Sequence, residues 1–161
     1  MKKLPSIIFF GLLVFNLISG TVLAAPPQHK ATGGGIVDWR SHGPVTYGFS
    51  ALQVDSEGNA KGQFQFNWHE GEFKVHAKVL YLSVNDITRD AWIGVEITKS
   101  NVTAAPVGSH RVIRVRDNGE SQDTISDMVG QLMGVPDASI ALTQPPLALY
   151  RVWTNGNVQV R

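Results

Sequence analysis

The stretch VTYGFSALQVDSEGNAKGQFQFNW, residues 45–68, has the pattern of a β-hairpin that covers a hydrophobic core. Along both arms, apolar and polar side chains alternate with the period of two that a half-buried strand shows. The apolar set, which we expect to face inward together, is Val45, Tyr47, Phe49, Ala51, Phe64, Phe66 and Trp68. The turn at residues 55–62 contains Gly58 and Gly62, which tolerate positive φ angles. The hairpin therefore predicts a sheet with one face on the core and one face in water.

The same alternation continues along most of the chain that follows. A long strand is expected from residue 73, and its inner face is predicted to carry Phe73, Val75, Ala77, Val79 and Tyr81. Between residues 80 and 84 both faces are apolar, which indicates that the strand passes beneath a loop or a helix. Further strands are expected at residues 91–98, 111–116, 147–153 and 158–160. The fold class is therefore predicted to be all-β, an antiparallel β-sandwich or flattened barrel of about eight strands.

Residues 124–133 break the alternation. The apolar residues of this segment recur at the spacing of one face of an α-helix, and they are Ile125, Met128, Val129, Leu132 and Met133. We therefore expect one short helix near residues 124–133 that docks on the sheet. The competing interpretation is a short strand at residues 124–126 followed by a loop. Residues 136–146 are expected to be irregular, with room for a short strand at residues 139–142.

The first 25 residues have the three parts of a secretory signal peptide. Lys2 and Lys3 come first, an apolar run follows, and Ala24 and Ala25 offer a cleavage site. The competing interpretation is an uncleaved membrane anchor, because the apolar run approaches the length that spans a bilayer. With cleavage, we expect residues 26–35 to form a flexible N-terminal arm and residues 36–161 to form a single β-domain. The mature protein is then expected to be soluble, and either secreted or periplasmic.

Charge and cysteine content limit the classes of partner. The chain has 14 basic residues, 13 acidic residues and no cysteine. Without Lys2 and Lys3, 12 basic residues remain, so the net charge of the mature chain is about −1. This balance argues against nucleic acid as a partner and gives no reason to expect binding to anionic membranes. The lack of cysteine excludes disulfides and thiolate metal sites. We expect a glycan or a protein at the cell surface as the partner, and we leave the oligomeric state open.

Short pieces spread along the chain match one family in the same order. They are residues 31–35 (ATGGG) with Phe49, residues 62–66 (GQFQF), residues 75–77 (VHA), residues 115–120 (VRDNGE) with Asp123, and residues 156–160 (GNVQV). Together they resemble an exported bacterial β-domain known as the post-COAP type. The resemblance implies a β fold and export, and it implies no activity. Members of that family continue after the acidic turn with a β-like segment, so the resemblance conflicts with the helix expected at residues 128–133.

Two motifs suggest ligand chemistry. The triple glycine at residues 33–35 lacks the strand, helix and lysine of a phosphate-binding loop, so we expect it to let the backbone pass close to another strand. The densest group of oxygen ligands is the acidic turn with Asp117, Asn118 and Glu120, followed by Asp123 and Asp127. These residues predict at most a weak calcium site, because the spacing does not fit an EF-hand loop. The alternative is a plain hairpin turn at residues 118–119, and no other cofactor is expected.

Histidine and carboxylate residues do not form a recognisable catalytic motif. His69 and His76 flank two glutamates, Glu70 and Glu72, and a zinc site would need His42 or His110 to be brought in by the fold. No G-x-S-x-G nucleophile motif occurs, and the two glutamates sit in a charged turn where solvated carboxylates are ordinary. We therefore assign no catalytic residue and expect no enzyme activity.

Aromatic residues give the stronger indication of function. Trp92 alternates with an inward-facing set, and Trp39 and Trp153 lie at strand ends, so we expect these three residues to bind a glycan or a protein. The competing interpretation places Trp92 beneath a helix or a loop. The predicted function is an exported, non-catalytic binding or structural module at the cell surface or in the extracellular space. The alternatives are a secreted hydrolase with an unrecognised site and a strand-exchanging subunit whose N-terminal arm pairs with a neighbour.

Overall fold

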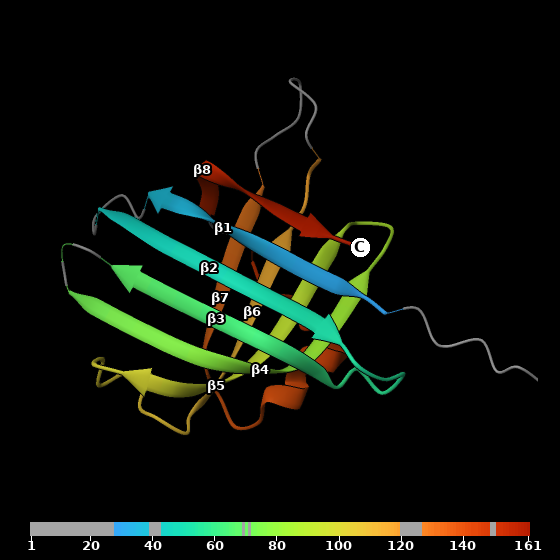
Figure 1. Ribbon diagram of the computed structural model, residues 1–161, viewed down its shortest axis with the longest axis horizontal. Coiled ribbons are helices and arrows are strands. Elements are labelled where there is room, and N and C mark those ends of the chain that lie inside the picture. Colours follow the sequence, from blue (N-terminus) through green and yellow to red (C-terminus); the bar gives the residue numbers. More distant parts are fainter. Residues whose placement is uncertain (1–27, 39–42, 69, 71, 120–126, 149–150) are drawn as a thin grey trace, which may run out of the picture.

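In the computed structural model, eight antiparallel strands close into a barrel (Figure 1). The structure describes residues 28–38, 43–68, 70, 72–119, 127–148 and 151–161. The elements are, in chain order, β1 (Lys30–Asp38), β2 (Pro44–Gln53), β3 (Ala60–Trp68), β4 (Phe73–Asn85), β5 (Asp90–Ser100), β6 (His110–Arg116), β7 (Met128–Val135), the 3-10 helix η1 (Ala138–Thr143) and β8 (Arg151–Val160). Each strand pairs with the next, and β1 pairs with β8 to close the barrel. The all-β prediction is confirmed, and the barrel is the form observed.

The hairpin of residues 45–68 forms as its alternation predicts. β2 and β3 pair so that Phe49 lies opposite Phe64, and the side chains of Tyr47, Phe49 and Phe64 are all buried. The rings of Tyr47 and Phe66 meet edge to face, with centroids 5.3 Å apart. In the turn, Gly58 adopts a φ of 85°, which a side chain would disfavour. This hairpin supplies the large aromatic part of the interior.

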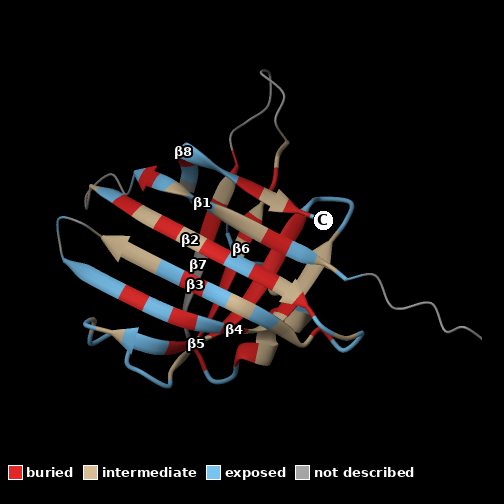
Figure 2. Cartoon of the chain, viewed as in Figure 1, coloured by how far each residue is buried: buried red, intermediate tan, exposed pale blue. Residues whose placement is uncertain are grey.

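Inward-facing side chains fill the barrel. Buried and exposed residues alternate along the strands (Figure 2), as expected when one face of each strand points to a common core. The interior set includes Ala31, Val37, Val45, Tyr47, Phe49, Phe64, Val75, Val79, Leu82, Ile93, Val95, Ile97, Ile113, Val115, Val129, Trp153 and Val158. The side chains of this set pack against one another, so burial of apolar surface stabilises the barrel without a disulfide.

Two details of β4 differ from the simple alternation. Phe73 is 37% exposed, contrary to the prediction, because it begins the strand at the rim of the barrel and packs there on Trp68. Between Val79 and Tyr81 a β-bulge shifts the register, so that Leu82 points inward and is 1% exposed, while Tyr81 joins an apolar cluster on the outer face. The bulge explains why both faces read as apolar between residues 80 and 84.

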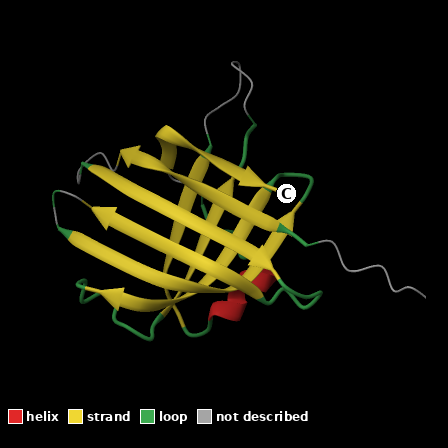
Figure 3. Cartoon of the chain, in the orientation of Figure 1, coloured by secondary structure: helices red, strands yellow, loops and turns green. Residues whose placement is uncertain are grey.

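A second, smaller apolar cluster lies outside the barrel. The helix η1 covers the outer face of β4, β5 and β6 (Figure 3), where Trp92, Val112 and Ala141 are buried. The prediction that the chain passes beneath a loop or a helix near residues 80–84 is therefore confirmed. The covering helix begins at residue 138, where Asp137 caps it by accepting a hydrogen bond from the backbone N–H of Ser139.

The helix expected near residues 124–133 is wrong for its described part. Residues 128–133 belong to the strand β7, which pairs with β6, and Val129 points into the core at 2% exposed. Apolar residues four positions apart share one face of a strand as well as one face of a helix, so this spacing does not distinguish the two. The pairing decides for a strand, because without β7 the edge of β6 would have no hydrogen-bond partner. The alternative of a short strand at residues 124–126 lies outside the described residues. The short strand considered for residues 139–142 is instead part of η1.

The flexible arm expected at residues 26–35 is wrong from residue 30 onward. Residues 30–35 lie within β1, which pairs with β2 on one side and with β8 on the other. Ala31 is fully buried in the core, so this segment contributes both hydrogen bonds and packing to the barrel. The domain therefore begins at least as early as residue 30.

Candidate functional site

The tryptophans expected to bind a ligand are not exposed where the structure describes them. Trp92 is 5% exposed beneath the segment that contains η1, and its indole N–H donates to the backbone oxygen of Pro145 at 2.9 Å. Trp153 is 3% exposed and points into the barrel beside Tyr47. Trp39 lies outside the described residues. An exposed aromatic platform is therefore wrong for Trp92 and Trp153, because one is covered by the chain itself and the other fills the core.

The acidic turn performs a structural task. Asp117 is 8% exposed; one carboxylate oxygen accepts from the backbone N–H of Gly119 at 2.8 Å, and the other accepts from Val160 N–H at 3.1 Å. Asp127 accepts in the same way from Asn118 N–H and from Val158 N–H. Each of these four carboxylate oxygens therefore already has a donor within the chain.

These two aspartates lie at the seam between β7 and β8. The two strands pair at only two described positions, Met128 with Val152 and Val129 with Arg151. Beyond these pairs, the carboxylates of Asp117 and Asp127 accept from alternate N–H groups of β8, as the carbonyls of a neighbouring strand would do. Sequence reasoning missed this role, because Asp127 was interpreted as part of a helix.

The described residues named in the remaining metal and catalytic predictions do not gather into one site. Among the described residues, no three His, Asp or Glu side chains gather where they could hold a metal ion. Glu120, Asp123, His42 and His69 lie outside the described residues, so the calcium site remains a prediction. The Nδ1 atom of His110 lies 3.2 Å from the backbone oxygen of Pro136. Glu70 and Glu72 are exposed in the turn between β3 and β4.

Asp90 is a buried carboxyl group whose pKa lies well below its ordinary value. It is 1% exposed and accepts hydrogen bonds at 2.8 Å from Arg114, Arg116 and Thr88. Burial alone would raise its pKa, but the hydrogen bonds from Arg116, Arg114 and Thr88 outweigh burial and lower the pKa from 3.8 to about 2. Arg114 also lies over the ring of Trp92, 5.1 Å from its centroid. A carboxyl group held ionised in this way serves structure, because general acid–base catalysis needs a pKa near the working pH.

A groove of about 510 Å³ lies on the opposite outer face, over β1, β2, β3 and β4. Its outward-facing lining residues include Gly34, Thr46, Gly48, Gln63, Gln65 and His76. The strand register places Gly34 opposite Gly48, Gly48 opposite Gln65, and Gln65 opposite His76. One row across four strands thus begins with two residues that lack side chains and continues with an amide and an imidazole.

The backbone conformation does not require either glycine of this row. Neither Gly34 nor Gly48 has a positive φ angle. A Cβ atom added at Gly34 would have its nearest neighbour, a backbone oxygen of β2, at an ordinary distance of 3.7 Å. A Cβ at Gly48 would meet first the side chain of Gln65, which is flexible and can move aside. Glycine inside a strand is unfavourable by about 0.5–1 kcal/mol relative to alanine, so Gly34 lowers stability without a benefit to packing, whereas Gly48 makes room for the side chain of Gln65.

The other glycines of the same motif behave as the sequence predicts. A Cβ at Gly33 would lie 2.6 Å from the ring of Phe49, and a Cβ at Gly35 would lie 2.1 Å from the backbone oxygen of Asn155. The expectation of close backbone approach is therefore confirmed at residues 33 and 35. Only the middle glycine of the triple, Gly34, points to the outer face, and the alternation of strand residues could have identified it.

Comparison of the chain with protein-family models, with curated proteins and with solved structures finds no match. The resemblance to the post-COAP type therefore remains a prediction. Within the described residues, no helix is long and apolar enough to cross a membrane.

Proposed function

We propose that the protein is an exported, non-catalytic binding module whose ligand lies in the groove floored by Gly34 and Gly48. The observation that carries the proposal is the space beside Gly34, which neither backbone conformation nor packing demands; the space beside Gly48 is occupied by the side chain of Gln65. Glycine in a strand often marks a place where a ligand or another backbone approaches closely. The signal-like residues 1–25 support export.

The chemistry of the lining favours a polar, extended ligand such as a polysaccharide chain. Thr46 offers a hydroxyl group, while Gln63 and Gln65 offer amide groups that both donate and accept hydrogen bonds.

The same lining argues against catalysis at this groove. The residues that line it include no carboxylate; their titratable side chains are those of His76, which faces outward, and Tyr47, which is buried in the core. Glycoside hydrolysis uses a pair of carboxylates, and nucleophilic hydrolysis uses a base held by a third group. The described groove therefore suits binding better than bond cleavage.

The proposal is tested by filling the groove. The backbone amide signals of ¹⁵N-labelled protein are followed by NMR while a panel of oligosaccharides is added to the wild type, to Gly34→Val and to Thr32→Val. Thr32 faces outward on the same strand and does not line the groove, so Thr32→Val is the matched control. We expect ligand-induced shifts around residues 34, 48 and 65 in the wild type and the control, and none in Gly34→Val.

Two outcomes would overturn the proposal. Equal binding by Gly34→Val and wild type would show that the ligand does not use the groove. Shifts confined to another part of the barrel would place the binding site elsewhere.

A further inference from the structure

The lysines of the barrel are distributed unevenly. After the first three residues the chain has five lysines, and all five lie on strands β1, β3, β4 and β5: Lys30, Lys61, Lys74, Lys78 and Lys99. The register pairs Lys74 with Asn67, Lys78 with Gln63 and Lys99 with His76. Because paired residues of neighbouring strands point to the same face, these side chains share the outer face that carries the groove.

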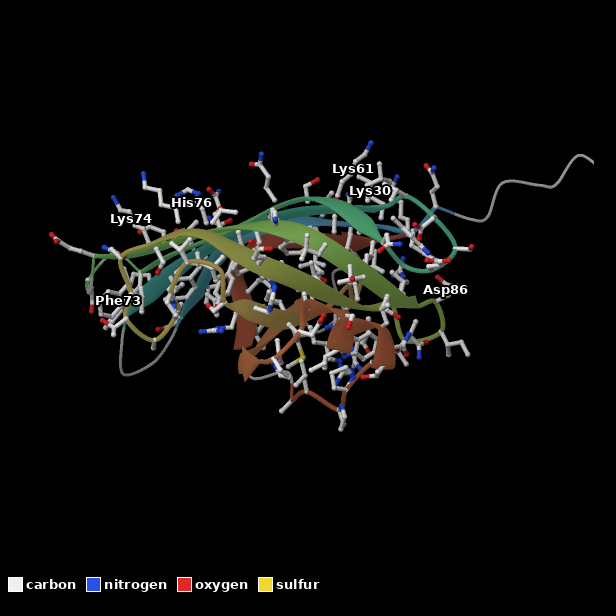
Figure 4. All side chains as sticks on the ribbon, turned by 90° about the horizontal axis from the view of Figure 1, so that it is seen from below. Lys30, Lys61, Phe73, Lys74, His76 and Asp86 are labelled. Atoms are coloured by element: carbon white, nitrogen blue, oxygen red, sulfur yellow. The ribbon has the colours of Figure 1, made fainter. Side chains whose placement is uncertain are left out.

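The figure of the side chains shows the same arrangement for four labelled residues. Lys30 and Lys61 project near one end of this face, and Lys74 and His76 project from the same side near the other end (Figure 4). The groove lining reaches from Gly34 and Gly48 on β1 and β2 to His76 on β4, beside Lys74. The positive charges therefore flank the groove.

Most of this charge is not neutralised within the described structure. Among the described residues, Lys78 is the one lysine of the five that forms an ion pair, with Glu96 at 3.0 Å. The arginines are used differently: Arg114 and Arg116 bind the buried Asp90. Lysine suits a solvated surface that meets changing anions, whereas the planar guanidinium group suits fixed, buried pairing.

The acidic residues lie mostly away from this face. The described carboxylates on strands β1 to β4 are limited to Asp38, at the end of β1, and the others in this half of the chain are in turns: Asp55, Glu57, Glu70, Glu72 and Asp86. A protein of nearly balanced charge thus presents a positive sheet face bounded by negative turns.

We propose that the ligand of the groove is an acidic polysaccharide, whose carboxylate or phosphate groups contact the flanking lysines while its sugar hydroxyls contact the groove lining. This inference rests on the proposed function and adds the class of ligand. The charge of the face complements an anionic polymer, and the groove admits a chain close to the backbone at Gly34 and Gly48.

Other occupants fit the observations less well. A neutral glycan is usually held by stacking on an aromatic ring, but the aromatic residues beneath this groove, Tyr47, Phe49 and Phe64, point into the core. An anionic membrane would be matched by several exposed apolar side chains beside the lysines. Among the described residues of β1 to β4, the exposed large apolar side chains are limited to Ile36 and Phe73, at 38% and 37%, and the most exposed ones, Ile87 and Val107, lie in loops. Nucleic acid would require a stronger basic excess than the chain carries.

The experiment measures binding of full-length mature protein to defined polymers by calorimetry. The probes are polygalacturonate fragments for carboxylate, poly(glycerol phosphate) for phosphate, dextran as a neutral polymer, single-stranded DNA, and vesicles containing anionic lipid. We expect binding to one or both acidic polymers and at least about tenfold weaker binding when the salt concentration rises from about 50 to 500 mM, because ion contacts are screened and counterions are released. We expect little binding to dextran.

Charge variants locate the effect. Lys61→Gln with Lys74→Gln should weaken binding of the acidic polymer roughly fivefold or more. Arg89→Gln removes one positive charge from the β4–β5 turn outside this face and serves as the control, with an expected change below about twofold. Glu96→Gln removes a negative charge from the face and should strengthen binding.

The outcomes separate the inference from the proposed function. Binding of dextran that Gly34→Val abolishes and salt does not change would overturn the acidic ligand while supporting the groove. Acidic-polymer binding that is lost in the lysine variant and retained in Gly34→Val would overturn the groove and, with it, this inference. Stronger binding to DNA or to vesicles than to either polysaccharide would also overturn it.

Discussion

The two outer faces of the barrel differ in what fills the space beside a glycine. On the face of β4, β5 and β6, a Cβ atom at Gly94 would lie 2.2 Å from the backbone oxygen of Ala138, because η1 packs directly on the strand. On the face of β1 to β4, the space beside Gly34 admits a Cβ atom without close contact. One face therefore uses a glycine to receive the chain itself, and the other has a glycine, Gly34, whose neighbouring space the fold does not fill.

The charged residues show the same division. On the covered face, Arg114 bonds to Asp90, lies over Trp92 and donates to the backbone oxygen of Leu147, so it ties the covering segment to the barrel. On the open face, four of the five lysines have no ion pair among the described residues. An outer sheet face of this barrel is therefore apolar where the chain covers it, and polar and positive where the chain leaves it open.

Removing the central aromatic residue of the covered face should give the largest effect. We expect Trp92→Ala to lower the free energy of unfolding by about 3–5 kcal/mol, because it deletes a buried ring and a hydrogen bond to Pro145. Denaturant unfolding followed by circular dichroism measures the change. Ile87→Ala, at a side chain that is 94% exposed, is the control and should change stability by less than about 0.5 kcal/mol. A small loss for Trp92→Ala would mean that η1 contributes little to the fold.

The glycine of the covered face gives the next effect. Gly94→Ala should lower the free energy of unfolding by about 1–3 kcal/mol, because its Cβ would displace the backbone of η1. The same unfolding measurement checks it. An unchanged free energy of unfolding would contradict the close packing of η1 on the covered face, since it would show that η1 can move away freely.

Acid should weaken the attachment of the covering segment. The pKa of Asp90 is lowered to about 2, so its ion pairs stabilise the folded state above the ordinary pKa of 3.8 and are lost as the pH falls from about 4 to 2. A shift of nearly two pH units corresponds to about 2 kcal/mol. We expect the free energy of unfolding of the wild type to exceed that of Asp90→Asn by about this amount near pH 6. We expect this difference in free energy to shrink toward zero at pH 2. A difference that stays constant between pH 6 and pH 2 would contradict the assignment.

Much of the fold could be predicted from alternation alone. The hairpin of residues 45–68 and the strands around Val75, Ile93 and Ile113 have clear inner faces, because each was long enough to show a period of two. β7 could not be predicted, since its apolar residues also fit a helix and only the open edge of β6 decides between the two. Trp92 was correctly placed on an outer face, but its burial depends on η1, whose position is a tertiary property.

The groove was harder to foresee than the fold. Gly34, Gly48, Gln65 and His76 lie on four different strands, and they form one row only when the register of three strand pairs is known. A glycine in a sequence also does not reveal whether its missing side chain makes room for the core, for the backbone or for a ligand. The five lysines could be counted from the sequence, but their common face requires the same register.

The barrel's independence of the space beside Gly34 can be tested directly, without a ligand. The free energy of unfolding of Gly34→Val is compared with that of the wild type by denaturant titration. If the space at residue 34 is not needed by the fold, the variant should be as stable as the wild type or more stable by up to about 1 kcal/mol, because valine favours a strand. A loss of more than about 1 kcal/mol would contradict the account, since it would show that Gly34 serves the barrel and not a partner.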